Sequence, residues 1–145
     1  MSSVYRYLLR TNDQKLTTLQ TELAFIDSYY HLLRTRYGAG IDLKKNIDAP
    51  FLEYRIPPLT LQLLFENAVK HNIVSTDQPL VIRMVTNADS CLTVSNTLQR
   101  KSINRVNSTQ KGLLNILTKY QLLGQAVPRV EETTDSFVVI LPLIH

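Results

Sequence analysis

The pattern of hydrophobic positions divides the chain into a helical first part and a second part in which strands and helices alternate. Apolar residues recur at intervals of three and four over residues 19–37, which predicts one long amphipathic helix that Gly38 and Gly40 end. Thr17 or Thr18 is expected to cap its first turn. The apolar seam of this helix consists of Leu19, Leu23, Ile26, Tyr30, Leu33 and Tyr37. Such a seam suits packing against another helix or a partner subunit, and packing on its own domain is the alternative.

Short apolar runs after Gly40 predict strands, and two longer periodic segments predict helices. The predicted strands are 41–47, 80–86, 91–94, 127–131 and 137–143. Turn residues at 87–90 and 134–136 predict two hairpins. Helices are expected in the segment 57–72, with Pro58 near the first turn, and over 112–123, whereas the polar segment 96–110 predicts a mobile loop.

The simplest architecture for these elements is an α/β (α+β) two-layer sandwich, in which two or three helices cover one face of a mixed sheet. We expect an N-terminal helical arm over residues 1–38 and a domain over residues 39–145. The arm would also include a short amphipathic piece around Val4 and Leu8.

Composition narrows the class of protein only slightly. The chain has 145 residues, 44% of them hydrophobic, which suits one globular domain. Its single cysteine excludes an internal disulfide, and its apolar runs are all too short for a membrane helix. The net charge of +4 is mild. A nucleic-acid interaction would rest only on the basic residues between Arg100 and Lys111, without a recognition motif, so we expect no nucleic-acid partner.

The segment 57–72 carries the strongest chemical signal. Its predicted helix has an apolar stripe at positions i, i+3, i+4 and i+7, which consists of Leu61, Leu64, Phe65 and Ala68. The opposite arc brings together Glu66, Asn67, Lys70 and His71. A solvated helix face is the alternative interpretation of this polar arc.

The run Glu66-Asn67-Ala68-Val69-Lys70-His71, with the double proline before it, resembles the N box of sensor histidine kinases. It is similar in particular to the LytS/YehU-like class, whose pattern is Pro-Pro-x-x-x-Gln-x-Leu-x-Glu-Asn-Ala-x-Lys-His. The order of the predicted elements also resembles the Bergerat fold, the ATP-binding sandwich of the GHKL superfamily. In this resemblance, residues 3–9 correspond to the end of the dimerisation hairpin and residues 19–38 to the connecting helix.

The resemblance implies a Mg²⁺–ATP site on this helix. Asn67 would bind magnesium through its side-chain oxygen, and Glu66 would polarise a metal-bound water or accept a proton. Lys70 and His71 would face the phosphates. Leu63 lies among these polar residues and would line the base or ribose side of a pocket, and a partly exposed leucine is the alternative interpretation.

Two further segments match the family less closely. Ser108 to Asn115 resembles the G2 segment at the start of a helix, where Gly112 would allow close approach of phosphate, Lys111 would add charge and Leu113 would contact the nucleotide. The family's first glycine is Gln110 here, and capping of an ordinary helix is the alternative interpretation.

The other segment is Val94 to Thr97, which stands where the family has an Asp-x-Gly motif that reads the adenine amino group. Ser95 occupies the aspartate position and Asn96 follows it, while Thr97 replaces the glycine. Ser95 or Asn96 can accept a hydrogen bond from an amino group, although without the charge of a carboxylate.

The resemblance implies an enzyme, the ATP-binding catalytic domain of a two-component sensor histidine kinase. It would transfer the γ-phosphoryl group to a histidine outside this fragment, so the fragment alone would not be competent. Its parent would form a homodimer through the helical arm and act on a response regulator. We expect a cytoplasmic domain of an inner-membrane-anchored bacterial protein, attached to the membrane only through upstream segments. The alternative is a degenerate GHKL module that acts by protein–protein interaction and binds nucleotide weakly or not at all.

Overall fold

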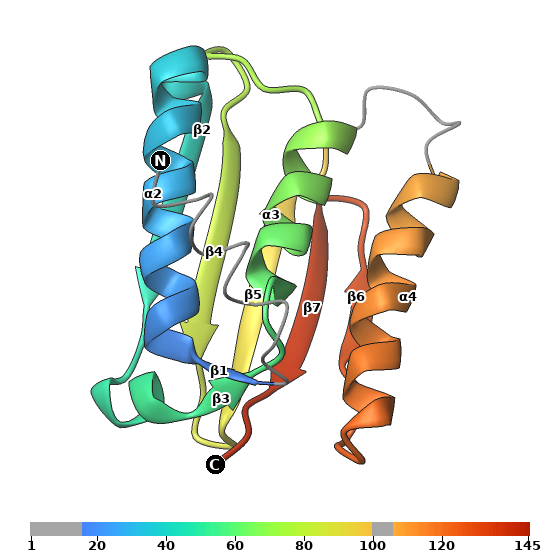
Figure 1. Ribbon diagram of the computed structural model, residues 1–145. Helices are drawn as coiled ribbons and strands as arrows, with labels where there is room; N and C mark the ends of the chain where they lie inside the picture. The colour runs from blue at the N-terminus through green and yellow to red at the C-terminus, as the bar shows by residue number, and fades with distance from the viewer. Residues whose placement is uncertain (1–15, 100–105) are drawn as a thin grey trace, which may run out of the picture.

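The computed structural model describes residues 16–99 and 106–145, and for residues 106–112 it describes the backbone alone. A five-stranded sheet forms one layer, and the helices α2, α3 and α4 lie side by side on one of its faces (Figure 1). The helices are α2 (Leu19–Tyr37), α3 (Thr60–His71) and α4 (Val106–Leu122). The strands are β1 (Thr17–Thr18), β2 (Ile41–Asn46), β3 (Arg55–Ile56), β4 (Leu80–Thr86), β5 (Cys91–Thr97), β6 (Arg129–Glu132) and β7 (Ser136–Pro142). The predicted two-layer sandwich is therefore confirmed.

The sheet is mixed, and its strand order is β2-β4-β5-β7-β6. Strand β2 runs parallel to β4, and every other neighbouring pair is antiparallel. The β4–β5 and β6–β7 pairs are the two hairpins that the sequence predicts. A separate two-residue ladder joins β1 to β3, with Thr17 opposite Ile56.

The core lies between this sheet and the three helices. Alternate residues of β4 point toward the helices, and Leu80, Ile82 and Met84 are at most 1% exposed. The predicted apolar stripe of α3 is buried against them. Burying a large aliphatic or aromatic side chain contributes about 1.5–3 kcal/mol, so this alternation fixes which side of the sheet the helices cover.

Helix α2 packs on its own domain, and the expected use of its apolar seam against a partner is wrong for the first half of the seam. Leu19, Leu23 and Ile26 are at most 6% exposed within the described chain, and the other seam residues are partly buried against the same core. Thr18, not Thr17, caps the helix, because its Oγ1 accepts a hydrogen bond from the Thr21 amide. The helix ends at Gly38, whose positive φ of 56° is readily adopted by glycine.

The packing of α2 bears on the expected arm over residues 1–38. Residues 1–15 lie outside the described residues, and for them the arm stays a prediction. Residues of α2 and of the later described elements share one hydrophobic core, and the division at residue 38 stays a prediction. Among the described helices, none is long and apolar enough to span a bilayer.

Helix α4 begins at Val106, six residues before the predicted start. The polar residues 107–111 are tolerated in a helix, and one internal glycine weakens a helix by about 1 kcal/mol without ending it. The segment that was expected to be a loop thus divides between the end of β5, the first turns of α4, and residues 100–105, which lie outside the described residues.

Candidate functional site

Helix α3 carries most of the candidate site, and it starts in an unusual way. Pro57 and Pro58 lie before the helix rather than in its first turn, and the N-cap residue Leu59 has a left-handed φ of 67°. Leu59 offers no side-chain cap. The first turn is held instead by Thr60, whose hydroxyl donates to the Pro57 carbonyl at 2.7 Å, and by Glu22 of α2.

Asn67 and Leu63 lie one turn apart on α3, and both are half-buried. In the described part of the chain, the Asn67 side-chain nitrogen is buried without a hydrogen-bond partner. A buried polar atom left in this state costs about 1–3 kcal/mol. The carboxamide can turn to place either its oxygen or its nitrogen at this position. Asn67 is therefore a polar group available to a ligand.

The other predicted residues of α3 do not all share one face with Asn67. Glu66 is half-buried, and its Oε1 accepts a hydrogen bond from Gln62 Nε2 at 2.9 Å. It lies near Tyr29 of α2, whose phenol has a pKa raised by burial and, second, by the Glu66 charge. Lys70 is exposed. The polar arc of the sequence prediction is thus spread around the helix.

His71 departs most from the expectation that it faces the phosphates. Its side chain is only 7% exposed, so it belongs to the buried side of α3 and not to the open polar arc. The reason is the helical period, which turns position 71 back toward the core beside Leu64 and Ala68.

Asn96, and not Ser95, points toward the helices. Strand β5 alternates between buried and half-buried residues, and Asn96 shares the buried face with Leu92 and Val94. Ser95 lies on the opposite face of the sheet, paired with Arg83 and Val138. Because side chains of a strand alternate between its faces, the two residues cannot serve the same site. Of the two residues that the sequence offers for contact with the base, Asn96 alone lies on the helix side of the sheet.

Lys111 and Gly112 lie inside α4, not at its start. The amide groups without an intrahelical partner are the first four of a helix, and here they belong to residues 106–109. The expected phosphate cradle at Gly112 therefore does not correspond to a helix N-terminus. Leu113 is half-buried, and α4 runs beside α3 (Figure 1).

Two side chains that the sequence interpretation missed join the end of α3 to the end of β5. Asn72 Nδ2 donates to the Ala68 carbonyl, and Asn72 Oδ1 accepts from the Gln99 amide at 2.7 Å. Gln99 Nε2 donates in turn to the carbonyls of Ile73 and Gln78. The position of Asn72 directly after the helix is a signal that could have indicated this role.

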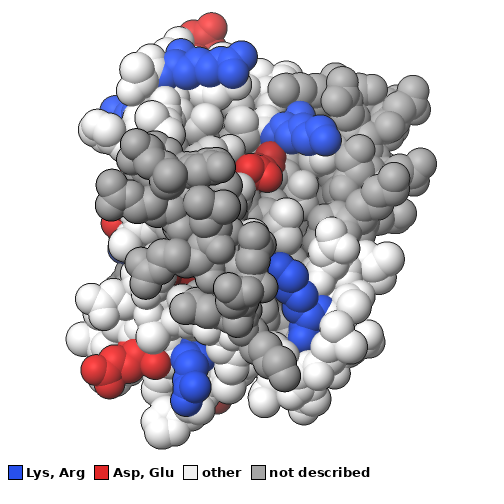
Figure 2. All heavy atoms as spheres, in the orientation of Figure 1, with Lys and Arg blue, Asp and Glu red and all other residues white. Residues whose placement is uncertain are grey.

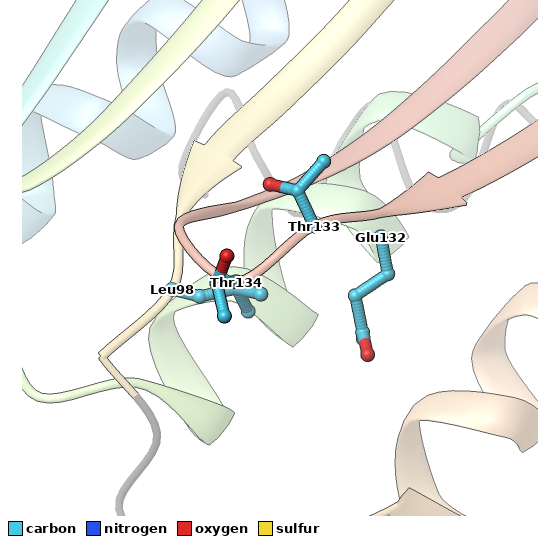
Figure 3. A pocket seen from close by; sticks show the side chains of 4 residues that line it. All are labelled: Leu98, Glu132, Thr133 and Thr134. Carbon is cyan, nitrogen blue, oxygen red and sulfur yellow. The ribbon is translucent and has the colours of Figure 1, made fainter.

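A hollow of about 520 Å³ lies beside the end of β5, lined by Leu98, Glu132, Thr133 and Thr134. Its volume is in the range of small-molecule sites. Figure 3 shows Glu132 extending from β6 on the side of the sheet where α3 and α4 lie. The register agrees, because Glu132 pairs with Phe137 and Phe137 pairs with Asn96, so all three share the helix side. No pattern in the sequence indicates this hollow.

Charge alone does not mark the site. On the described part of the face in Figure 2, basic side chains are scattered among uncharged and acidic ones. Within the described residues, no three His, Cys, Asp or Glu side chains gather as a metal-binding group. A metal at Asn67 would therefore need most of its ligands from elsewhere.

A family model described as histidine kinase matches residues 1–41. Over 78 residues the chain is 30% identical to the sensor histidine kinase/phosphatase LytS of Staphylococcus aureus, a match that covers 54% of this chain and 13% of that protein. These findings confirm the resemblance to LytS-like histidine kinases. Because the match spans about an eighth of the relative, the activity and partners of the whole protein are matters for proposal.

Solved structures give the same fold. The chain is similar to the blue-light activated histidine kinase EL346 of Erythrobacter litoralis, with a TM-score of 0.53 and 16% identity over 97% of this chain and 51% of that one. The cytoplasmic segment of histidine kinase QseC has a TM-score of 0.55 and 20% identity, over 92% of this chain and 82% of that one. The histidine kinase AdeS of Acinetobacter baumannii has a TM-score of 0.59 and 9% identity, over 98% of this chain and 76% of that one. The sequence match is thus to sensor histidine kinases of the LytS kind, and the solved structures show that the fold is the same.

Proposed function

We propose that this domain binds Mg²⁺–ATP between α3 and α4 and presents the γ-phosphoryl group to a histidine on another segment. The observation that carries this proposal is Asn67, a half-buried carboxamide whose nitrogen has no protein partner in the described residues. It lies on the helix whose sequence resembles the N box. Phosphoryl transfer of this kind needs positioning and charge stabilisation rather than covalent chemistry by the protein.

The residues of α3 fit a magnesium ion held mainly by substrate. Mg²⁺ prefers oxygen ligands and retains several waters, so the Asn67 oxygen with phosphates and water is a sufficient set. When bound, the ion would neutralise part of the phosphate charge. Glu66 would orient a water or accept a proton, and the exposed Lys70 would contribute positive charge one turn away. His71 is assigned no phosphate contact, because it is buried.

The base would occupy the hollow beside β5. Leu98 offers an apolar wall, and the Glu132 carboxylate and two threonine hydroxyls offer polar partners. Asn96 lies on the same side of the sheet and would face the ribose or base. Lys111, Gly112 and Leu113 of α4 would close the phosphate side, in keeping with their place beside α3.

The wider assignments follow the histidine kinase family in general. The parent would dimerise through segments that include residues 1–15, and a response regulator would receive the phosphoryl group from the modified histidine. The domain would work on the cytoplasmic side of a membrane-anchored bacterial sensor.

A degenerate GHKL module that acts by protein contacts is the second candidate. It is favoured by Ser95, which faces away from the helices, and by Gly112, which lies inside α4. Both features depart from what a nucleotide site of this class needs.

Calorimetric titration of ATP with and without magnesium separates the two candidates. Catalytic-domain function predicts magnesium-dependent binding that the Asn67→Ala substitution abolishes. Asn46→Ala, at the exposed end of β2, is the matched control and should bind as the original chain does. Unchanged binding by the Asn67→Ala chain would overturn the role of Asn67. Absence of binding by the original chain at millimolar ATP would favour the degenerate module.

A further inference from the structure

A buried carboxylate of α2 bonds the start of α3, and a lysine of α4 contacts the same region. Glu22 of α2 is 1% exposed, and its two oxygens accept hydrogen bonds from the amides of Leu59 and Leu61, each at 3.3 Å. These amides belong to the N-cap residue and the first turn of α3, and the N-cap residue makes no side-chain cap hydrogen bond. Lys119 of α4 approaches the same point, and its Nζ donates to the Pro58 carbonyl at 3.1 Å.

The segment before α2 is attached to the same region by backbone contacts. Strand β1 pairs with β3, and the Leu19 amide donates to the Tyr54 carbonyl at 2.8 Å. Residues 17–22 are therefore connected to residues 54–61 at three successive points. We therefore expect a shift of α2 to displace the start of α3, where Lys119 of α4 provides a further contact through the Pro58 carbonyl.

We propose that Glu22 is a positioning residue that transmits the position of α2 to the first turn of α3 and, along that helix, to Asn67. Asn67 lies six residues after Leu61, which is about 9 Å along a helix. A helix of twelve residues moves as a unit over this distance. The importance of Asn67 in this inference rests on the proposed function.

The protonation state of Glu22 offers a way to test the connection without changing the covalent structure. An ionised carboxylate accepts both amide hydrogen bonds, whereas the neutral acid has one hydroxyl oxygen that is a poor acceptor. Burial raises the pKa of Glu22 to about 7, and the hydrogen bonds to Leu61 and Leu59 and the Lys119 charge lower it less strongly. The other described titratable groups at this junction are Lys119 and Tyr120 of α4. Burial lowers the pKa of Lys119 and raises the pKa of Tyr120, so it favours the neutral form of each.

The test is a pH titration of backbone amide resonances in the complete 145-residue chain by ¹⁵N–¹H NMR. We expect the amides of Leu61 and Asn67 to shift with one common midpoint near pH 7. Glu22→Gln should abolish the shift of the Leu61 amide, together with the part of the Asn67 shift that has the same midpoint. Glu53→Gln, an exposed carboxylate in the turn η2 (Ala49–Glu53), should leave both unchanged. His71 is present in all three chains, so its effect on the Asn67 amide is common to them.

The outcomes separate this inference from the proposed function. A Leu61 shift without a matching, Glu22-dependent Asn67 shift would show that the effect ends in the first turn and would overturn the proposal. Absence of both shifts would overturn it as well. If the Glu22→Gln chain does not fold, unequal midpoints of Leu61 and Asn67 in the original chain would still refute it, and a common midpoint would support it. The ATP titration decides the proposed function separately.

Discussion

Replacement of Glu22 by Gln should change how the stability of the domain depends on pH. The substitution keeps the volume of the side chain and removes its ionisation. In the folded chain, burial raises the pKa of Glu22 from its ordinary value of 4.5 to about 7. The folded state therefore holds a proton that the unfolded chain releases between these two pH values.

The sign of the effect follows from linkage. A carboxyl group whose pKa is raised on folding contributes stability that is fully present below pH 4.5 and is lost as the pH rises through 7. The difference between 4.5 and 7, at about 1.4 kcal/mol per pH unit, gives a loss of about 3 kcal/mol. For a chain of this length the loss corresponds to about 10 °C in melting temperature.

Chemical denaturation at several pH values from 5 to 9 measures this loss directly. The free energy of unfolding of the Glu22→Gln chain, relative to the original chain, should rise across this range by most of the expected 3 kcal/mol. Glu53→Gln should keep a constant difference from the original chain, because Glu53 is exposed. A constant difference for Glu22→Gln would show that its ionisation is not linked to folding. A difference that falls with pH would mean that Lys119 and the two amides outweigh burial.

Three further substitutions test the packing, the hollow and the end of α3. Leu23→Ala should lower the free energy of unfolding, measured in denaturant, by about 2–5 kcal/mol. Leu32→Ala on the same helix should change it by less than about 0.5 kcal/mol, because Leu32 is 59% exposed. Equal effects of the two substitutions would contradict packing of α2 on its own domain. Glu132→Gln should weaken ATP binding several-fold in calorimetry. Glu131→Gln should not, because Glu131 pairs with Arg129 on the other face of β6. Equal affinities of the two variants would show that Glu132 does not contact the base. Gln99→Ala should increase amide hydrogen exchange in residues 72–79, and unchanged exchange would show that other contacts hold this segment.

The fold could be predicted from the sequence because each element carries a strong periodic pattern. Strands β4 and β5 alternate in hydrophobicity and flank a clear turn, and α3 has a complete apolar stripe. The α2 seam was harder to interpret, since periodicity shows that a helix has an apolar face but not what covers it. The start of α4 was missed because its polar first turns resemble a loop in composition.

The candidate site was predictable only where its residues are neighbours in sequence. Leu63 and Asn67 could be proposed together because they belong to one motif on one helix. Glu132 lies about 65 residues away from them and reaches the same side only through the pairing of β6 with β7. Ser95 and Asn96 could not be told apart without the strand register, because a strand turns each successive side chain to the opposite face.

Helix α3 is held by polar side chains at both ends, and this arrangement bears on how the site would respond to the rest of a sensor. At its start, Glu22 of α2 bonds the Leu59 and Leu61 amides. At its end, Asn72 bonds the Gln99 amide, directly before the segment 100–105 that leads into α4. A helix fixed at both ends transmits a displacement rather than absorbing it by fraying. A change in α2 would therefore reach both Asn67 and Gln99 through a single rigid element.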